Sequence, residues 1–308
     1  MRVKRAAICR TLPCRAICAL YFVGQIPTKA HHDLIFRGRR NDVPRASSMS
    51  SLGIPVRVVA RDTSVRGSPN VISFHDVKPH CASCGLRELC LPFGLGPDVI
   101  RQLDNIIAHR TRIKKKASLY RPGESFTALY AIRLGTFKTL LLAEDGREQI
   151  IGYHMAGEII GLDGIGDERY ACQAIALEDS EVCFLPFNQL EQLALELPTL
   201  RRNLYRLVSR DLCRDQEMML LLGSRCAEER LALFLLNLAE RYQARGYSAS
   251  EFVLRMTREE IASYLGLKLE TVSRLFSSLQ EQGLIQVQGR AVKLLDSVAL
   301  KQLIGRSC

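Results

Sequence analysis

Short apolar runs interrupted by glycine fill residues 120–187, and they predict a domain rich in strands. The runs are LYAIRLGTFKTLLL (129–142), EDGREQIIGYHMAGEIIGLDGIG (144–166) and EVCFLPF (181–187), each bounded by turn residues. Asp145-Gly146 suits a hairpin turn, because both residue types tolerate positive φ. Several short strands at this spacing indicate a β-roll of the jelly-roll type rather than alternating βαβ units.

A helical spacing of apolar positions replaces the strand pattern from about Leu200 to Gly223. Steps of four and three residues along this stretch pass through Leu204, Val208, Asp211, Asp215, Met218 and Leu222. Such a seam is typical of a coiled coil, here with two carboxylates inside it. Like charges brought together across a two-fold axis repel each other, so the seam predicts a dimer helix whose association is weak. The alternative is a helix whose acidic side chains face water.

Residues 227–246 predict another amphipathic helix, which ends at Gly246 and opens a C-terminal domain. The next helix has a clear start signal, because Thr257 followed by Glu260 forms a capping box. Gly266 stands where a tight turn between two helices is needed.

The helix after this turn is expected to have one apolar and one polar face. The apolar positions are Val272, Leu275, Phe276 and Leu279, and the polar positions are Glu270, Ser273, Arg274 and Ser277. Two short strands around Gly289-Arg290 would follow as a wing. A capped helix, a glycine turn, a second helix and a wing, in this order, indicate a winged helix-turn-helix.

The polar face of the second helix carries side chains suited to reading DNA. In the major groove Arg274 could donate two hydrogen bonds to guanine, Glu270 could accept from cytosine, and Ser273 could reach a base or a phosphate. The competing interpretation is an amphipathic helix pair whose polar face is simply solvated.

Charge is distributed unevenly along the 308 residues, whose formal net charge is +11. Residues 1–48 hold 10 Lys and Arg against 2 Asp and Glu, which gives +8, and the rest of the chain carries only +3. DNA binding must therefore depend on a local basic surface rather than on a cationic chain. No run of 18 apolar residues occurs, so we expect no membrane-spanning helix.

The basic N-terminal segment shows no helical or strand period. We expect residues 1–74 to be a disordered or untranslated extension followed by a flexible lead-in, with Met49 as the alternative start of translation. A signal peptide is the weaker alternative, because Arg15 lies just ahead of the apolar run and no clean cleavage site follows.

The segment HCASCGLRELC (80–90) places three cysteines within ten positions. A disulfide framework suits secreted proteins, whereas a DNA-binding protein works in the reducing cytoplasm, which is the location we expect. Zinc and iron–sulfur clusters both prefer thiolate ligands, and the spacing alone leaves the two open.

The chain resembles the cyclic-AMP receptor/FNR family of bacterial transcription regulators, and within it the anaerobic, fumarate-and-nitrate-reduction branch. The motifs that carry the resemblance lie within residues 75–300 and are CASCGLRELCLPF, LDNII, LYAIRLGT, AEERLA and YLGLKLETVSRL. The resemblance implies an α+β fold. Its parts would be an iron–sulfur segment and cyclic-nucleotide-binding-like β-roll (75–198), a dimerisation helix (199–223) and a winged helix-turn-helix (224–308).

The resemblance also implies the functional residues. One 4Fe–4S cluster per subunit would be bound by Cys81, Cys84, Cys90 and Cys183, with Cys172 as the rival for the fourth position. A homodimer would form without oxygen and read an inverted repeat of TTGAT-like half-sites.

Further roles follow by the same resemblance. Glu270, Ser273 and Arg274 match the recognition signature Glu-x-x-Ser-Arg. Asp215, with Leu212 beside it and Asp211 in the same seam, would control dimerisation. As an activator of anaerobic genes, the protein would contact RNA polymerase.

The sequence departs from the cyclic-AMP-binding branch at the phosphate and ribose contacts. Leu162 follows Gly161 where that branch has a glutamate, and Arg169-Tyr170 replaces its Arg-Ser pair, so no cyclic nucleotide is expected. We find no phosphate loop, nucleophile elbow or His-Glu metal motif, and therefore expect no enzyme. The alternatives are a relative that senses nitric oxide, redox state or a cyclic nucleotide, and a structural-zinc protein that binds DNA constitutively.

Overall fold

A computed structural model describes residues 72–74, 80–107, 109–143 and 146–304, all of which belong to the unit Pro55–Cys308. The N-terminal extension, the alternative start Met49 and the turn residue Asp145 lie outside the described residues.

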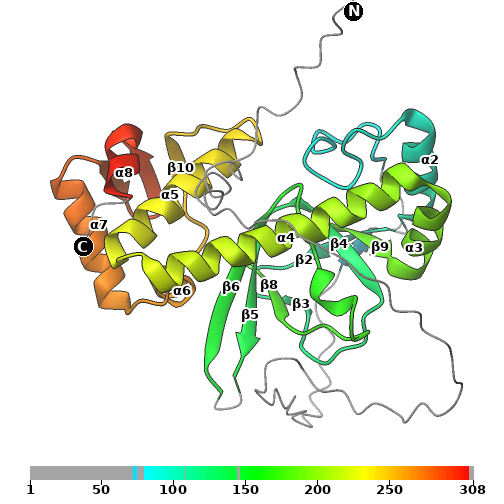
Figure 1. The fold of residues 1–308 in the computed structure, drawn as a ribbon, viewed down its shortest axis with the longest axis horizontal. Helices are drawn as coiled ribbons and strands as arrows, with labels where there is room; N and C mark the ends of the chain where they lie inside the picture. The colour runs from blue at the N-terminus through cyan, green and yellow to red at the C-terminus, as the bar shows by residue number, and fades with distance from the viewer. Residues whose placement is uncertain (1–71, 75–79, 108, 144–145, 305–308) are drawn as a thin grey trace, which may run out of the picture. The chain divides into compact units, whose positions relative to one another are not determined.

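Two antiparallel sheets form the N-terminal half of the described chain (Figure 1). The five-stranded sheet has the order β1-β2-β9-β4-β7, and the four-stranded sheet has the order β3-β8-β5-β6. The strands are β1 Ile72–Phe74, β2 Arg110–Ile113, β3 Ser118–Tyr120, β4 Ala128–Leu134, β5 Thr136–Leu142, β6 Glu148–Met155, β7 Ile159–Ile160, β8 Gln173–Ala176 and β9 Ser180–Pro186. The predicted β-roll is confirmed.

The local signals within the roll act as expected. β5 and β6 pair as the predicted hairpin, and Gly146 in its turn has φ +83°. Residues Ile72–Phe74, inside the expected lead-in, form strand β1 on β2. Gly135 joins β4 to β5 at φ +93°, and a Cβ there would lie 2.1 Å from Ser180 Oγ, so only glycine fits this turn.

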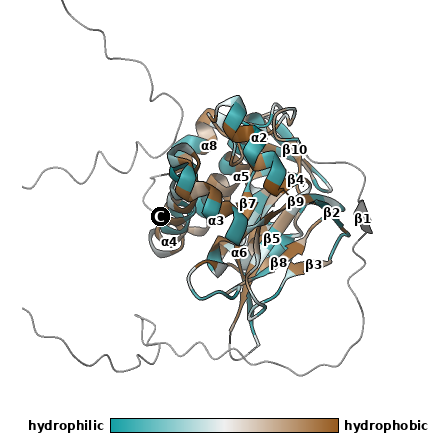
Figure 2. Cartoon of the chain, turned by 90° about the vertical axis from the view of Figure 1, so that its right-hand side faces the viewer, coloured by the Kyte–Doolittle hydropathy of each residue, from teal (hydrophilic) through white to brown (hydrophobic). Residues whose placement is uncertain are grey.

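Helices cover one end of the five-stranded sheet. They are α2 Pro97–Ile106, α3 Phe187–Glu196 and the 27-residue α4 Pro198–Ser224, which includes the predicted dimer helix. Their apolar faces share one core with β4 and β9, built around Leu103, Leu129, Leu185, Leu190 and Leu200. Figure 2 shows both hydrophobic and hydrophilic residues along α3 and α4, as expected of half-buried helices.

The C-terminal part is the predicted winged helix-turn-helix. It contains α5 Ala227–Gln243, β10 Glu251–Val253, α6 Arg258–Leu265, α7 Leu269–Glu281, β11 Ile285–Gln288, β12 Ala291–Leu294 and α8 Ser297–Leu303. The capping box is present, with Glu260 N–H donating to Thr257 Oγ1 and Thr257 N–H donating to Glu260 Oε2. Gly266 is left-handed at φ +62°. The wing has a third strand, β10, that the sequence did not reveal.

Among the described residues, no helix combines the length and the apolar character needed to cross a bilayer.

Candidate metal centre and DNA-reading helix

The cysteine segment is a series of tight turns packed onto the core. Cys84 N–H donates to Cys81 O, and Cys90 N–H donates to Leu86 O at 3.1 Å, so the backbone folds back on itself. Asp104 on α2 accepts the Cys81 amide at 2.5 Å and lies 3.9 Å from His80 Nδ1. The three cysteines are thereby held in one loop against α2.

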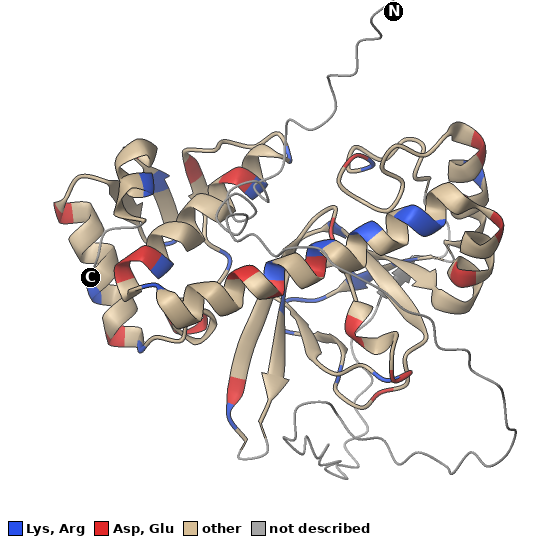
Figure 3. Cartoon of the chain, in the orientation of Figure 1, with Lys and Arg blue, Asp and Glu red and all other residues tan. Residues whose placement is uncertain are grey.

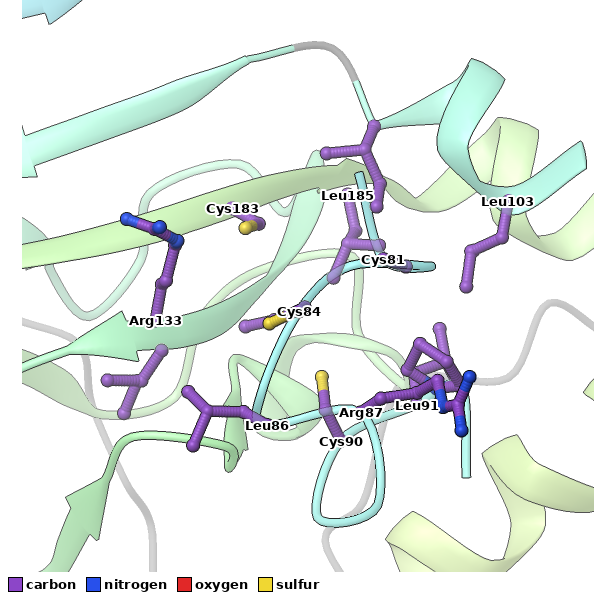
Figure 4. A pocket seen from close by; sticks show the side chains of 14 residues that line it. Cys81, Cys84, Leu86, Arg87, Cys90, Leu91, Leu103, Arg133, Cys183 and Leu185 are labelled. Carbon is purple, nitrogen blue, oxygen red and sulfur yellow. The ribbon is translucent and has the colours of Figure 1, made fainter. Parts of the chain in front are cut away.

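Cys183 joins this loop from the five-stranded sheet. It lies in β9, opposite Ala131 of β4 and Arg110 of β2. Together the four predicted ligands line one cavity that is partly open to solvent, whose other walls include Leu86, Leu91, Leu103, Ile107, Ile132 and Leu185. Figure 4 shows the loop cysteines and Cys183 around the same space.

The thiols are in an apolar setting that disfavours their ionised form. Burial raises the pKa of Cys90 to about 12 and raises the pKa of Cys81 and of Cys183 above the usual range. Arg110 and Arg133 oppose this effect at Cys183. A metal bound here would displace the thiol protons, and the arginines would offset part of the negative charge.

Four cysteine thiols are ligands that both zinc and iron–sulfur clusters accept. Within the described ranges, no three His, Cys, Asp or Glu side chains lie close enough together to hold one metal ion. A structural zinc ion needs four ligands at about 2.3 Å from one centre. A 4Fe–4S cluster takes one thiolate on each of four irons, so its ligands surround a larger group. Four thiols around one cavity supply the ligand type of either centre.

Cys172, the rival fourth ligand, lies elsewhere. It immediately precedes β8, is buried, and is not among the residues that line the cysteine cavity. Its Sγ donates to Asp163 Oδ2 at 3.2 Å, and this carboxylate also accepts the amides of Ala171 and Cys172. The thiol therefore has a local structural partner.

The interior of the β-roll is occupied by aromatic rings. Tyr120 and Tyr170 stack with centroids 4.0 Å apart, and Phe126 meets Tyr170 edge to face. Leu162 begins a short 3₁₀ turn, and Arg169 donates to Gly123 O at 2.6 Å. Leu162, Arg169 and Tyr170 are thus engaged in packing or in backbone hydrogen bonds.

The exposed stripe of α4 overlaps the predicted seam at Val208 and Asp215. The exposed stripe runs through Tyr205, Val208, Leu212, Asp215 and Met219, at spacings of three and four residues. Asp211, predicted in the seam, is half-buried, lies 3.6 Å from Arg214 and has its pKa raised by burial. Figure 3 shows basic residues on the first half of α4 and both signs of charge near its middle. Asp215 and Leu212 are therefore on one exposed face, and Asp211 is beside it.

The recognition helix presents its predicted residues to solvent. Glu270, Ser273 and Arg274 are all exposed near the N-terminal end of α7, while Val272 and Phe276 are buried on its other face. Arg258 of α6 lies over the Phe276 ring at 3.2 Å and packs the two helices together. The three polar side chains are therefore on the exposed face of α7.

The contacts of Asp104 and of Glu158 could not be predicted from the sequence. Asp104 lies within the LDNII motif, but nothing in the motif indicates that its carboxylate holds the amide 23 residues earlier. Glu158 binds arginines 83 and 87 residues later, and no local pattern could reveal those partners.

A β-roll with an attached long helix and winged helix-turn-helix defines a class of DNA-binding transcription regulators. Residues 110–196 match the cyclic nucleotide-binding domain family, and residues 229–303 match the Crp-like helix-turn-helix domain family. The chain belongs to the Crp/FNR family of bacterial transcription regulators, whose members bind DNA and dimerise, and it is not an enzyme.

Individual relatives agree with this assignment. The chain is 46% identical over 230 residues to the transcriptional regulatory protein btr of Bordetella pertussis, covering 74% of this chain and 95% of btr. It is 44% identical over 228 residues to the fumarate and nitrate reduction regulatory protein of Escherichia coli (strain K12). This match covers 74% of this chain and 91% of that protein. The structure of FixK2 from Bradyrhizobium japonicum matches with a TM-score of 0.60 at 31% identity. The match covers 65% of this chain and 98% of the FixK2 chain.

Proposed function

We propose that this protein is a cytoplasmic, oxygen-responsive regulator that activates anaerobic gene expression. Cys81, Cys84, Cys90 and Cys183 would bind one 4Fe–4S cluster per subunit. The observation that carries the proposal is that these four cysteines, from a loop and a distant strand, line one apolar cavity. The similarity to the fumarate and nitrate reduction regulatory protein supports the anaerobic role.

In this proposal the cluster supplies a removable link between its four thiolate ligands. The loop carries three of these ligands, Cys81, Cys84 and Cys90. The fourth, Cys183, is fixed in β9 between β2 and β4. A link among the four would therefore hold the loop against the sheet. Without it the loop is retained by weaker contacts, including the hydrogen bond from the Cys81 amide to Asp104.

Dimerisation would depend on the exposed stripe of α4. Tyr205, Val208, Leu212 and Met219 offer apolar area, whereas Asp215 places a carboxylate within the same face. Burying two such carboxylates across a two-fold axis costs free energy, so the balance between monomer and dimer is easily shifted. A coupling of about 1–3 kcal/mol to the cysteine loop changes an association constant by roughly 5–150-fold.

DNA reading would follow from the dimer. Two copies of α7 would place Glu270, Ser273 and Arg274 in successive major grooves of an inverted TTGAT-like repeat. A monomer reads a single half-site and loses the contribution of the second. The bound dimer would then contact RNA polymerase.

The test is to purify the full chain without oxygen, measure iron and acid-labile sulfide, and compare its binding to an inverted TTGAT-like repeat before and after air. We expect about four irons and four sulfides per chain and weaker binding in air. Zinc without iron, or an iron chromophore and DNA affinity that air leaves unchanged, would overturn the proposal.

A further inference from the structure

Glu158, in the turn between β6 and β7, is the centre of a charged cluster that spans three parts of the fold. Its side chain is 15% exposed and accepts hydrogen bonds from Arg241 at 2.8 and 2.9 Å and from Arg245 at 2.6 Å, both on α5. Arg214 on α4 lies 3.7 Å from the same carboxylate. One acidic side chain of the β-roll thus faces cations of both the long helix and the C-terminal domain.

The same arginines also bind the backbone of the turn. Arg241 donates to Tyr153 O at 2.6 Å, and Arg245 donates to Ala156 O at 2.7 Å. Burial would raise the pKa of Glu158, but Arg241, Arg214 and Arg245 hold it well below its usual range. The carboxylate is therefore ionised, and the position of the turn and the positions of the arginines depend on each other.

The opposite side of this turn contacts the cysteine loop. Gly157, adjacent to Glu158, has φ +90°, and a Cβ there would lie 2.8 Å from Leu89 Cβ and 3.8 Å from Leu86 Cβ. Leu86 and Leu89 stand between the second and third loop cysteines. The loop thus rests directly on the backbone of the turn, with no side chain between them.

The turn is also joined to the wall of the cysteine cavity. Gly157 N–H donates to Ile132 O at 2.7 Å, and Ile132 N–H donates to Glu158 O at 2.8 Å. Ile132 lines the cavity together with Arg133. Gly157 and Glu158 are therefore in direct contact with the cavity wall, and Gly157 also with the loop.

On α4 the cluster ends at the residues of the proposed dimer face. Arg214 lies between Glu158 and Asp211, at 3.7 and 3.6 Å, and directly precedes Asp215 in the chain. An arginine released from Glu158 has two carboxylates of its own helix within reach. The charge on the dimer face thus depends on where the turn lies.

We propose that the turn Met155–Glu158 transmits the state of the cysteine loop to both α4 and α5, with Glu158 as the positioning residue. This inference rests on the proposed function for the signal itself. Leu86 and Leu89 set the position of Gly157, and Glu158 sets the positions of Arg214, Arg241 and Arg245. A change in the loop then reaches the dimer helix and the DNA-binding domain through one carboxylate.

The first experiment compares full-length variants with and without air. Glu158→Gln and Arg214→Gln should bind iron and sulfide as the unsubstituted chain does. For each protein, the DNA affinity measured without air is divided by the affinity measured in air. We expect this ratio to be about fivefold or more lower in both variants than in the unsubstituted chain, and thus closer to one. Glu178→Gln is the matched control, because Glu178 pairs with Arg255 of the C-terminal domain at 3.2 Å without touching the turn. Unchanged ratios in both variants, at full iron content, would overturn the relay.

A second experiment does not depend on any cluster, so its failure is distinct from failure of the proposed function. Leu89→Ala and Arg214→Gln are combined in the metal-free full chain, and unfolding is measured in urea. When two substitutions act independently, their combined effect on the unfolding equilibrium constant equals the product of the single effects within roughly twofold. We expect the unfolding equilibrium constant of the double variant to differ at least threefold from the value that the two single variants predict. This difference should disappear when Glu158→Gln is also present. The pair Leu89→Ala and Glu178→Gln should show no such difference. Additivity of Leu89→Ala with Arg214→Gln would refute the relay whatever the metal.

Discussion

Lys138 Nζ lies 2.8 Å from Glu260 Oε1, and this ion pair joins β5 of the β-roll to the first helix of the helix-turn-helix. The two side chains are only 15% and 20% exposed. Glu260 also accepts the Thr257 amide that completes the capping box of α6. Nearby, Ile150 N–H donates to Ser263 Oγ at 3.1 Å. The start of α6 is therefore fixed by the β-roll as well as by its own cap.

Replacing Lys138 by Met is expected to lower the free energy of unfolding by about 1–2 kcal/mol, because a mostly buried carboxylate loses its cation. Burial would raise the pKa of Glu260, but Lys138 and the Thr257 amide hold it below its usual range. The stabilisation is thus present above the usual carboxyl pKa and is lost as pH falls through the lowered value. Urea unfolding at pH 7 and at pH 4 checks both statements. Lys114→Met, whose partner Asp179 is exposed, is the control and should have a smaller effect.

The choice of Cys183 over Cys172 as fourth ligand gives a paired prediction. Cys183→Ser should abolish the iron chromophore and the sulfide content, because one wall of the cavity loses its thiolate. Cys172→Ser should retain both, since a hydroxyl can keep the hydrogen bond to Asp163. Absorbance and iron analysis of anaerobically purified protein distinguish the two. Full iron content in Cys183→Ser would remove this residue from the ligand set.

Asp215→Ala is expected to increase the dimer fraction in air, since it removes the carboxylate from the exposed apolar stripe of α4. A buried like-charge pair costs on the order of several kcal/mol per ion, so a shift of tenfold or more in the dimer dissociation constant is expected. Sedimentation velocity across a concentration series measures it. Glu217→Ala, on a different side of the helix, is the control. Equal dissociation constants for Asp215→Ala and the unsubstituted chain would show that the carboxylate does not control association.

Arg274→Ala should weaken binding to the inverted repeat by about 1–3 kcal/mol per half-site and relax the base preference at one position. Arg274→Lys should recover only part of this, because an ammonium cannot form the paired hydrogen bonds of a guanidinium. Competition binding against repeats with each base changed in turn gives both quantities. A uniform loss on all sequences would mean that Arg274 contacts phosphate rather than a base.

Acid should destabilise the protein partly through His154. Burial, with Arg214 and Arg241, lowers the pKa of His154 to about 3, although Glu158 acts the other way. Its Nε2 is 3.0 Å from Thr139 Oγ1, and its buried Nδ1 has no hydrogen-bond partner.

The unfolded chain binds a proton at His154 below about pH 6.5, whereas the folded chain does so only near pH 3. Stability is therefore expected to fall as pH drops from 6.5 toward 3. His154→Gln should flatten that part of the pH profile measured by urea unfolding. An identical slope in His154→Gln would assign the effect to other groups.

Local signals in the sequence account for much of the fold. The Thr257 and Glu260 capping box, the left-handed Gly266 and the β5–β6 hairpin depend on residues within a few positions of each other. α2 and α3 were not anticipated, and neither was strand β10, which becomes a strand only by pairing with β12. Short elements of this kind are decided by tertiary packing rather than by propensity.

The sites divide in a similar way. The cysteine spacing and the resemblance predicted that four thiols would lie together, and all four line one cavity. Along α4 the predicted seam and the exposed stripe share Val208 and Asp215, whereas Asp211 is half-buried beside Arg214, and its place in a dimer stays a prediction. The partners of Asp104 and Glu158 are set by packing between segments far apart in the chain.

Asn203 of α4 is buried and donates to the carbonyls of Leu91 and Phe93, at 2.9 and 2.8 Å, directly after the third loop cysteine. One side-chain amide thus satisfies two backbone acceptors. The segment that follows Cys90 is therefore anchored to α4 by this side chain. The position of the loop's third cysteine therefore depends on the first turns of α4.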